Sequence, residues 1–262
     1  MKRRTVFFSV LILPLATLLL VVPTRARAAE SDATAILKAM SEYVGSQKTI
    51  KLTFDSAIEI ITPQLEKIQF TNSGDALLSR PDKLRAHRVS GHADVAMFFD
   101  GKTVKIFGKN INGYAQFDAP GSVDQLIHSL REGHGVALPG ADLLLSNSYE
   151  LLVAGIMEAK IIGRGIIDGI ECEHLAFRNF DTDWQLWVET GKNPIPRKMV
   201  VTSKTMNSAP QYTLRIKSWE TEVETSPSDF TFTPPADAEK LDHNALSELD
   251  ELPPGAPEGG NQ

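Results

Sequence analysis

Short apolar runs separated by tight turns fill the stretch 77–108, and they restrict this chain to an antiparallel sheet. Asp100-Gly101 stands between two such runs, 94–99 and 103–107. A two-residue hairpin turn of type I′ needs positive φ at both central positions, and Asp-Gly supplies it. Strands joined by so short a turn lie side by side and antiparallel, so this stretch predicts a meander.

The same signal returns later in the chain. Asp168-Gly169 separates the runs 159–167 and 170–180. Between and after these hairpins the pattern predicts about ten or eleven strands in all. An antiparallel sheet of that width cannot stay flat, because strands twist, so we expect it to curl.

Period-two alternation shows which side of the sheet is buried. The segment 50–62 places apolar residues at every second position, with polar residues between them. Such alternation is typical of a strand with one face in the core. The apolar positions are Ile50, Leu52, Phe54, Ile58 and Ile60. The run 94–99 is apolar on both faces, which predicts cover on both sides.

Helical periodicity occurs in two places. Residues 32–45 carry apolar side chains at helical spacing and end at Gly45, which predicts one amphipathic N-terminal helix. In mid-chain, Ser122 to Gln125 reads as a capping box, and Pro139 and Ser148 are each placed to start a further short helix. We therefore predict a mainly β fold with α elements (α+β), in which these helices cover the concave side of the sheet.

The N-terminus has the pattern of an export signal. Basic residues 2–4 precede an apolar run, 6–22, and Ala26-Arg27-Ala28 is a small-x-small cleavage pattern. We interpret 1–28 as a cleaved signal peptide, with an uncleaved membrane anchor as the alternative. No cysteine lies just after the apolar run, so an acyl anchor is not expected. We predict secretion into the periplasm.

The net charge of the exported part argues against some classes of binding partner. Five of the 27 Lys and Arg lie in residues 1–28, so the remainder carries 22 basic and 33 acidic residues, a net charge of −11. That argues against nucleic acid and anionic membrane surfaces, which select basic patches. We divide the exported part into one domain, 31–235, ending in a short strand at 230–235, and an acidic tail rich in Pro and Gly, 236–262, predicted to be disordered.

Several short motifs resemble those of one bacterial family. They are Ser79-Arg80-Pro81-Asp82-Lys83-Leu84-Arg85, Phe99-Asp100-Gly101-Lys102, Glu189-Thr190-Gly191-Lys192 before Pro196-Arg197-Lys198-Met199, and Phe230-Thr231-Phe232-Thr233-Pro234. In this order they resemble a family of predicted periplasmic proteins of unknown function, itself similar to the lipoprotein carriers LolA and LolB. The resemblance implies a curled antiparallel half-barrel, capped by helices, with an apolar cavity that holds acyl chains in the carriers.

Residues with reactive side chains form no convincing site. Cys172, the one cysteine, and His174 share a strand face, but a metal site needs further ligands. His87, His92 and Asp94 cluster around two turns without a nucleophile beside them. We therefore expect no metal, no cofactor and no enzymatic activity, and keep a hydrolase as the third alternative.

The apolar strand faces are the best candidate for a binding site. We predict that one concave face binds a lipid or acyl chain under a lid formed by the helices within 122–156. A fully packed core is the alternative, which would leave a protein-interaction module of the cell envelope. We expect a monomer. The predicted lining residues are Phe54, Ile58, Phe70, Leu84, Met97, Trp184, Leu186, Met199, Leu214 and Ile216.

Overall fold

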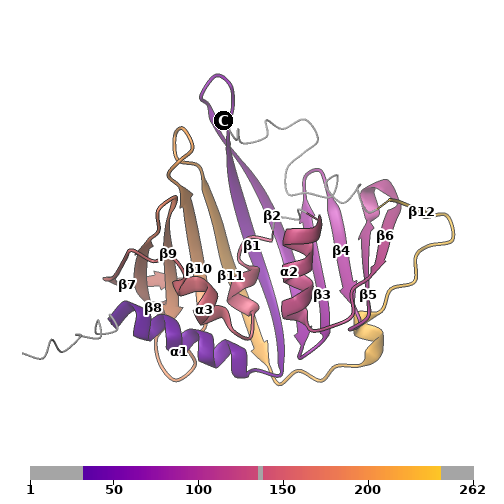
Figure 1. The fold of residues 1–262 in the computed structure, drawn as a ribbon, viewed down its shortest axis with the longest axis horizontal. Coiled ribbons are helices and arrows are strands. Elements are labelled where there is room, and N and C mark those ends of the chain that lie inside the picture. The colour runs from indigo at the N-terminus through magenta and orange to yellow at the C-terminus, as the bar shows by residue number, and fades with distance from the viewer. Residues whose placement is uncertain (1–31, 135–137, 243–262) are drawn as a thin grey trace, which may run out of the picture.

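One broad sheet with helices on a single face makes up the fold (Figure 1). The computed structural model describes residues 32–134 and 138–242. The strands are β1 (Thr49–Ile61), β2 (Lys67–Ser79), β3 (Lys83–Ser90), β4 (Asp94–Phe99), β5 (Thr103–Gly108), β6 (Gly113–Asp118), β7 (Glu158–Ile167), β8 (Ile170–Arg178), β9 (Thr182–Glu189), β10 (Pro196–Ser203), β11 (Gln211–Thr221) and β12 (Glu239–Lys240). The helices are α1 (Asp32–Ser46), α2 (Val123–His134) and α3 (Ser148–Val153), with 3-10 turns η1 (Lys109–Ile111), η2 (Ala141–Leu144) and η3 (Pro227–Phe230).

The strand order explains the shape of the sheet. It runs β12-β6-β5-β4-β3-β2-β1-β11-β10-β9-β8-β7. The chain meanders outward from β1 to β6, continues into the helical insert, and meanders back from β7 to β11, which pairs with β1. Neighbouring strands are antiparallel, except that β12 lies parallel to β6. β7 and β12 are the two ends of this order, so the described sheet is open, and the predicted mainly β fold with its helical cap is confirmed.

Alternation along the strands creates one continuous apolar face. Leu78 on β2 stands opposite Ile50 on β1 and Leu84 on β3. Leu84 in turn stands opposite Phe99 on β4, and all four side chains are buried. We call the face that carries this row, on which the helices pack, the inner face. Burial of such a row is the main source of folding free energy for a chain whose one cysteine, Cys172, is a free thiol.

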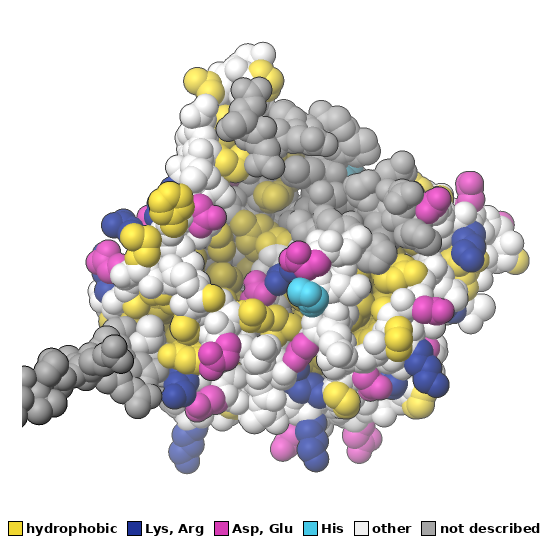
Figure 2. Space-filling view, viewed as in Figure 1, with side chains coloured by type: hydrophobic (Ala, Val, Ile, Leu, Met, Phe, Trp, Pro, Cys, Tyr) yellow, Lys and Arg dark blue, Asp and Glu magenta, His cyan; other side chains and the backbone are white. Residues whose placement is uncertain are grey.

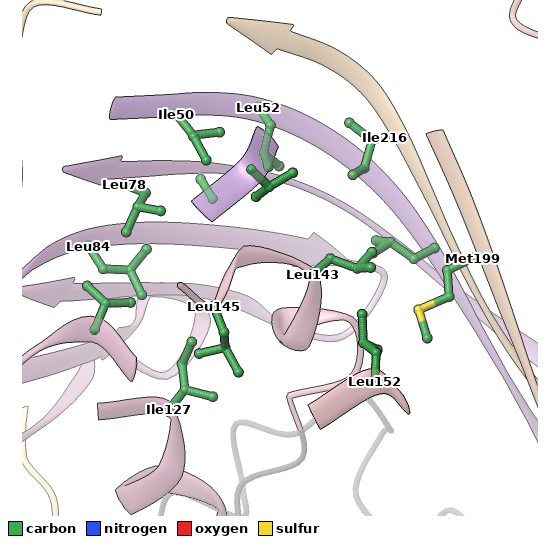
Figure 3. Packing of buried hydrophobic residues seen from close by; sticks show 14 of the residues in the cluster. Ile50, Leu52, Leu78, Leu84, Ile127, Leu143, Leu145, Leu152, Met199 and Ile216 are labelled. Carbon is green, nitrogen blue, oxygen red and sulfur yellow. The ribbon is translucent and has the colours of Figure 1, made fainter. Parts of the chain in front are cut away.

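The helical insert fills part of the inner face. Figure 3 shows side chains of the insert pointing towards those of the sheet, with Leu143 and Leu152 near Met199. α2 begins at the predicted capping box, in which the backbone N–H of Ser122 donates to Gln125 and that of Gln125 donates to the Ser122 hydroxyl. α1 contacts β7, β9, α3 and η2. None of the helices in the described ranges is both long and apolar enough to cross a membrane.

Arg80 joins the helices to the sheet. Its guanidinium donates to the backbone carbonyls of Gln47, at 3.1 Å, and Leu144, at 2.6 Å. It also lies 3.9 Å from a carboxylate oxygen of Asp124, and 14% of its side chain is exposed. One side chain at the end of β2 thereby holds the end of α1, η2 and the first turn of α2 together.

The C-terminal segment differs from the prediction. Residues 230–235 do not form a strand: η3 occupies 227–230, and Phe232 lies against Phe98 and Phe107 instead. Prolines 234 and 235 lack the N–H groups that a ladder needs, while Ser226 starts η3 with a capping box. Phe232 thereby covers the outer face of β4, which was predicted to be covered on both sides.

The predicted tail also begins later than expected. Glu239 and Lys240 form β12 beside Gly113 and Tyr114 of β6, so the first residues after 235 still belong to the sheet. Residues 243–262 lie outside the described part of the chain. A smaller correction concerns α3, where Asn147 and not Ser148 occupies the N-cap position.

Candidate functional site

All ten residues predicted to line a cavity lie on the inner face. Met199 on β10 is the cross-strand partner of Leu186 on β9 and of Leu214 on β11. The next row runs through Trp184, Val201, Tyr212, Ile58 and Phe70, each opposite the next across β9, β10, β11, β1 and β2. Alternation in the sequence therefore identified one real surface, although it did not show which parts of that surface are covered.

Burial divides the ten residues into two groups. Six are buried in the core against the helices: Leu84, Trp184, Leu186, Met199, Leu214 and Ile216. Four are half-buried: Phe54, Ile58, Phe70 and Met97. The half of the inner face nearer the helices is therefore packed, as the alternative of a packed core predicted. The remaining half is a candidate for contact with a ligand.

The inner face is hollowed between the β1–β2 hairpin and the helical layer (Figure 2). Hydrophobic side chains form the floor of this hollow. We call the half of the inner face nearer the β1–β2 turn the tip-side inner face. It comprises Phe54, Ser56, Ile58, Phe70, Asn72, Val201 and Tyr212.

The segment before η2 borders the tip-side inner face. The Tyr212 hydroxyl donates to the Pro139 carbonyl at 3.4 Å. Gly140 has φ of 81°, and a Cβ added there would come within 2.6 Å of a Leu214 methyl carbon. Glycine is required at this position both for the left-handed backbone and for the close approach to the sheet.

Two polar residues interrupt this apolar surface, and the sequence analysis missed them. Ser56 and Asn72 are cross-strand partners on β1 and β2, and each is 3% exposed. The Asn72 amide donates to the Ser56 hydroxyl at 3.5 Å. A signal was present in the sequence, because Ser56 falls in the apolar register of β1 between Phe54 and Ile58. A polar residue at a buried strand position is informative in itself.

Of the histidine and carboxylate cluster, His87 and Asp94 lie on the opposite side of the sheet from the tip-side inner face, whereas His92 lies in the turn between β3 and β4. His87 contacts Asp94 at 2.8 Å through Nε2 and Asp75 at 3.5 Å through Nδ1. Hydrogen bonding from His87 holds the pKa of Asp94 below its usual range, although partial burial opposes the shift. Both ring nitrogens are engaged with carboxylates, so the ring has no free nitrogen for general-base chemistry.

Cys172 and His174 are likewise accounted for by packing. Burial raises the pKa of the Cys172 thiol, which disfavours the reactive thiolate. His174 stacks on Trp187, with ring centroids 4.0 Å apart, and hydrogen-bonds Gln185. Across the described residues, no group of three or more His, Cys, Asp or Glu side chains is placed to hold a metal ion.

A separate groove lies between α1 and the β9–β10 turn. It measures about 670 Å³ and is lined by both acidic and basic side chains, including Glu42, Arg164, Glu173 and Lys192. Charged walls that alternate in sign suit an acyl chain poorly, because each charge would lose contact with water. The tip-side inner face is the better candidate for an apolar ligand.

Comparisons with known proteins give the following matches. A family model described as "Predicted periplasmic protein (DUF2092)" matches residues 33–243. An uncharacterized conserved protein from Thermus thermophilus has 10% identity and a TM-score of 0.47, over 80% of this chain and 99% of that chain. LprF from Mycobacterium bovis has 14% identity and a TM-score of 0.45, over 74% and 96%. A LolA superfamily protein from Nitrosomonas europaea has 13% identity and a TM-score of 0.34, over 76% and 97%. No curated protein matches the sequence.

Proposed function

This chain belongs to the DUF2092 family of predicted periplasmic proteins, and from that premise we propose that it binds a lipid or other apolar ligand on its tip-side inner face. The periplasmic location predicted from the N-terminus is confirmed by the family. The signal-peptide interpretation itself concerns residues 1–28, which lie outside the described part of the chain.

The observation that carries the proposal is the row of half-buried apolar side chains in the hollow. Ile58, Phe70, Val201 and Tyr212 lie on adjacent strands of one face, and each is half-buried. The part of this apolar surface that is still exposed to water gains free energy when a hydrocarbon chain covers it. A lipid tail is therefore the class of ligand that this surface favours.

The helical insert acts as a fixed wall of the site in this proposal, and not as the lid expected from the sequence. Leu126 and Leu130 of α2 are at most 1% exposed, so α2 is part of the core. Arg131 pairs with Asp142 and donates to the Leu138 carbonyl, which ties α2 to η2. Moving this layer would expose a packed core, so the ligand is expected to enter from the β1–β2 side.

The first experiment asks whether an apolar ligand is bound at all. Protein purified from its own periplasm is examined by native mass spectrometry, and then titrated with the fluorescent apolar probe N-phenyl-1-naphthylamine. We expect co-purified lipid and probe binding at micromolar concentration. The proposal fails if neither is observed.

A matched pair of variants tests the location of the site. Ile58 points into the hollow, whereas Ala57, its neighbour on β1, faces the opposite side. Ile58→Arg is expected to weaken probe binding roughly tenfold or more, because it places a charge on the apolar surface. Ala57→Arg is expected to leave binding unchanged. Equal effects of the two variants would contradict this location.

A second candidate function is that of a non-enzymatic interaction module, and β7 favours it. This strand ends the sheet order, and Ile162 and Ile166 on it are 52% and 64% exposed. An open apolar edge can accept a strand from a partner protein. If a partner in the cell envelope is bound there, Ile166→Lys should abolish its co-purification, while Leu65→Lys, at an equally exposed turn residue, should not.

A truncation separates this second candidate from binding through the acidic tail. The cut belongs after Asp242, because residues 237–241 still bond to β6 and its preceding turn. Lipid binding and edge-mediated binding should survive removal of 243–262, whereas a tail-mediated partnership should be lost.

A further inference from the structure

A row of polar side chains crosses the tip-side inner face. Ser56, Asn72 and Ser90 are successive cross-strand partners on β1, β2 and β3. His92 follows in the turn before β4, with its Nδ1 3.2 Å from the Ser90 hydroxyl. We call Ser56, Asn72, Ser90 and His92 the polar row. Apolar rings lie close to it, because Phe70 contacts the His92 ring edge-on.

Two atoms of the polar row are buried without a hydrogen-bond partner. They are Asn72 Oδ1 and His92 Nε2. The Asn72 side chain as a whole is 3% exposed, and its amide nitrogen already donates to Ser56. A buried polar atom without a partner costs about 1–3 kcal/mol, so native proteins contain few of them. Two such atoms in one row therefore need an explanation.

Ser90 links the backbone of the β3–β4 turn to the His92 ring. The Ser90 oxygen accepts from the backbone N–H groups of His92 and Ala93, which occupies both of its lone pairs. Its own proton has two acceptors within reach, His92 Nδ1 at 3.2 Å and the Ala93 carbonyl at 3.4 Å. In the neutral tautomer whose Nδ1 accepts from Ser90, the ring carries its proton on Nε2. In that tautomer the polar row presents one unused acceptor, Asn72 Oδ1, and one unused donor, His92 Nε2–H.

We propose that the polar row binds the head group of the ligand, and that the head group is neutral and carries a hydroxyl or amide. A hydroxyl can donate to an acceptor such as Asn72 Oδ1 and accept from a donor such as His92 Nε2–H, so one such group has the hydrogen-bonding chemistry that both atoms lack. A carboxylate cannot donate to Asn72 Oδ1 and would meet it with like partial charge. This inference rests on the proposed function, because the hydrocarbon part of the ligand must lie on the neighbouring apolar side chains.

The experiment compares two probes that differ in one hydrogen-bond donor. Tetradecan-1-ol has the hydroxyl, and 1-methoxytetradecane keeps the oxygen acceptor but has no donor. Each displaces N-phenyl-1-naphthylamine, and the measured quantity is the ratio of their dissociation constants. In Asn72→Leu the preference for the alcohol is expected to fall about 3- to 10-fold, the effect of one net hydrogen bond. Gln69→Leu, at an exposed position on the same strand, is the control and should keep the wild-type ratio.

The outcomes distinguish this inference from the proposal beneath it. If neither probe displaces the dye, the proposed lipid binding is wrong. If both displace it but Asn72→Leu keeps the wild-type ratio, the polar row does not bind the head group. Tighter binding of tetradecanoate than of tetradecan-1-ol also overturns the inference. Should Asn72→Leu not fold by circular dichroism, His92→Phe keeps the ring contact with Phe70, removes the donor and must weaken both oxygen-bearing probes relative to tetradecane.

Discussion

Arg80 shows how much a single side chain contributes to the helical layer. Its guanidinium donates to backbone carbonyls at the ends of α1 and η2, which are Val44 at 3.4 Å and Leu144 at 2.6 Å. Burial lowers the pKa of Arg80, while Asp124 opposes that shift. A planar group with several donors can reach these carbonyls together, which a lysine ammonium cannot do.

The first prediction concerns this contact. Arg80→Met removes the guanidinium, so the carbonyls lose its hydrogen bonds and Asp124 loses its ion pair with Arg80. The free energy of unfolding should therefore fall by about 2–4 kcal/mol. Arg80→Lys should recover only part of the loss. Urea denaturation measures both. Arg164→Met, at a side chain that is 62% exposed and pairs with the exposed Glu171 and the half-buried Glu173, is the control and should cost much less.

The second prediction concerns pH and the His87–Asp94 pair. Because the pKa of Asp94 is lowered in the folded protein, its contribution to stability is present above the unfolded pKa of about 3.9 and is lost as pH falls through the folded value. Asp94→Asn should therefore be less stable than wild type at neutral pH, by under about 1 kcal/mol because water screens the pair. The gap should close as the pH falls below the folded pKa of Asp94, because the carboxyl group is then protonated in both states.

Carboxyl titration by NMR provides an independent check of the cause. In His87→Gln the pKa of Asp94 should rise towards its ordinary value, since the largest contribution to its shift is the hydrogen bond from His87. A stability gap between wild type and Asp94→Asn that persists at low pH would contradict this explanation.

At the scale of elements, the segment after β11, residues 222–242, crosses the outer side of the sheet, and we call it the clasp. It leaves β11 in the middle of the sheet and reaches β6 at one edge. On the way, Phe232 stacks on Phe98 at 5.0 Å and contacts Phe107 at 4.9 Å. The Lys105 ammonium donates to the Phe232 carbonyl at 2.7 Å. The apolar outer side of β4 and β5 is thereby covered.

The third prediction tests the clasp. Phe232→Ala removes both ring contacts and should lower the free energy of unfolding by about 1–3 kcal/mol. Phe180→Ala is the matched control, because that ring is 85% exposed and its loss should change stability by less than about 0.5 kcal/mol. Thermal denaturation of the two variants measures the difference, and equal melting temperatures would contradict the role of Phe232.

Elements with strong local signals were predictable, and the clasp was not. Asp100-Gly101 and Asp168-Gly169 specify their hairpins through backbone chemistry that acts within a few residues. Phe232, in contrast, reads as a strand residue because it alternates with threonine. Its true partners are more than a hundred positions away on β4 and β5. Only tertiary packing decides between the two.

At the scale of the whole molecule, tertiary packing also decides which parts of the candidate site are open, and local patterns in the sequence do not show it. Alternation placed Ile58 and Leu186 on one face, because period two is a property of the strand itself. Which of them is covered depends on where the helices lie, and Leu186 is fully buried whereas Ile58 is half-buried. Asn72 was missed although, like its partner Ser56, it falls in the inner-face register of its strand, two positions after Phe70.

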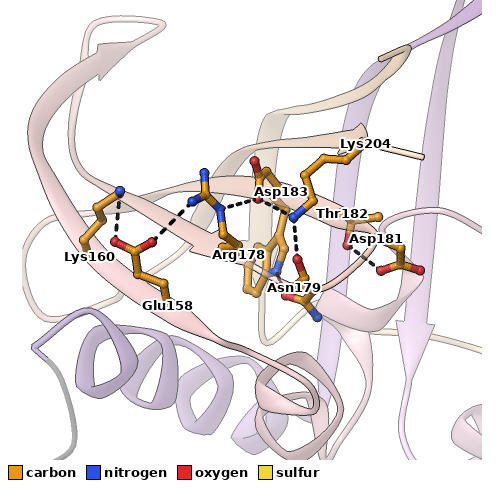
Figure 4. A network of polar contacts seen from close by, with 9 residues as sticks. Glu158, Lys160, Arg178, Asn179, Asp181, Thr182, Asp183 and Lys204 are labelled. Atoms are coloured by element: carbon orange, nitrogen blue, oxygen red, sulfur yellow. Dashed lines mark hydrogen bonds and ion pairs between the residues drawn. The ribbon is translucent and has the colours of Figure 1, made fainter. Parts of the chain in front are cut away.

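The two ends of the sheet are protected differently. β12 covers the β6 edge, with Glu239 and Leu241 donating their N–H groups to carbonyls of Asn112 and Tyr114. At the other end, no further described strand pairs with β7, and ion pairs lie along it. Figure 4 shows Glu158 between Lys160 and Arg178, and Arg178 beside Asp183. Charges at an edge discourage unwanted pairing, but they leave its backbone groups free.

The last prediction follows from this difference and compares two truncated chains. Removing residues 236–262 deletes β12 together with Leu241, whose side chain lies against Gly113, whereas removing 243–262 keeps both. The shorter chain should be less stable than the longer one by about 1–3 kcal/mol, because it loses two ladder hydrogen bonds and one apolar contact. With β6 exposed as well as β7, it should also self-associate more strongly in sedimentation velocity. If the two chains unfold at the same urea concentration and sediment alike, β12 does not protect the edge of the sheet.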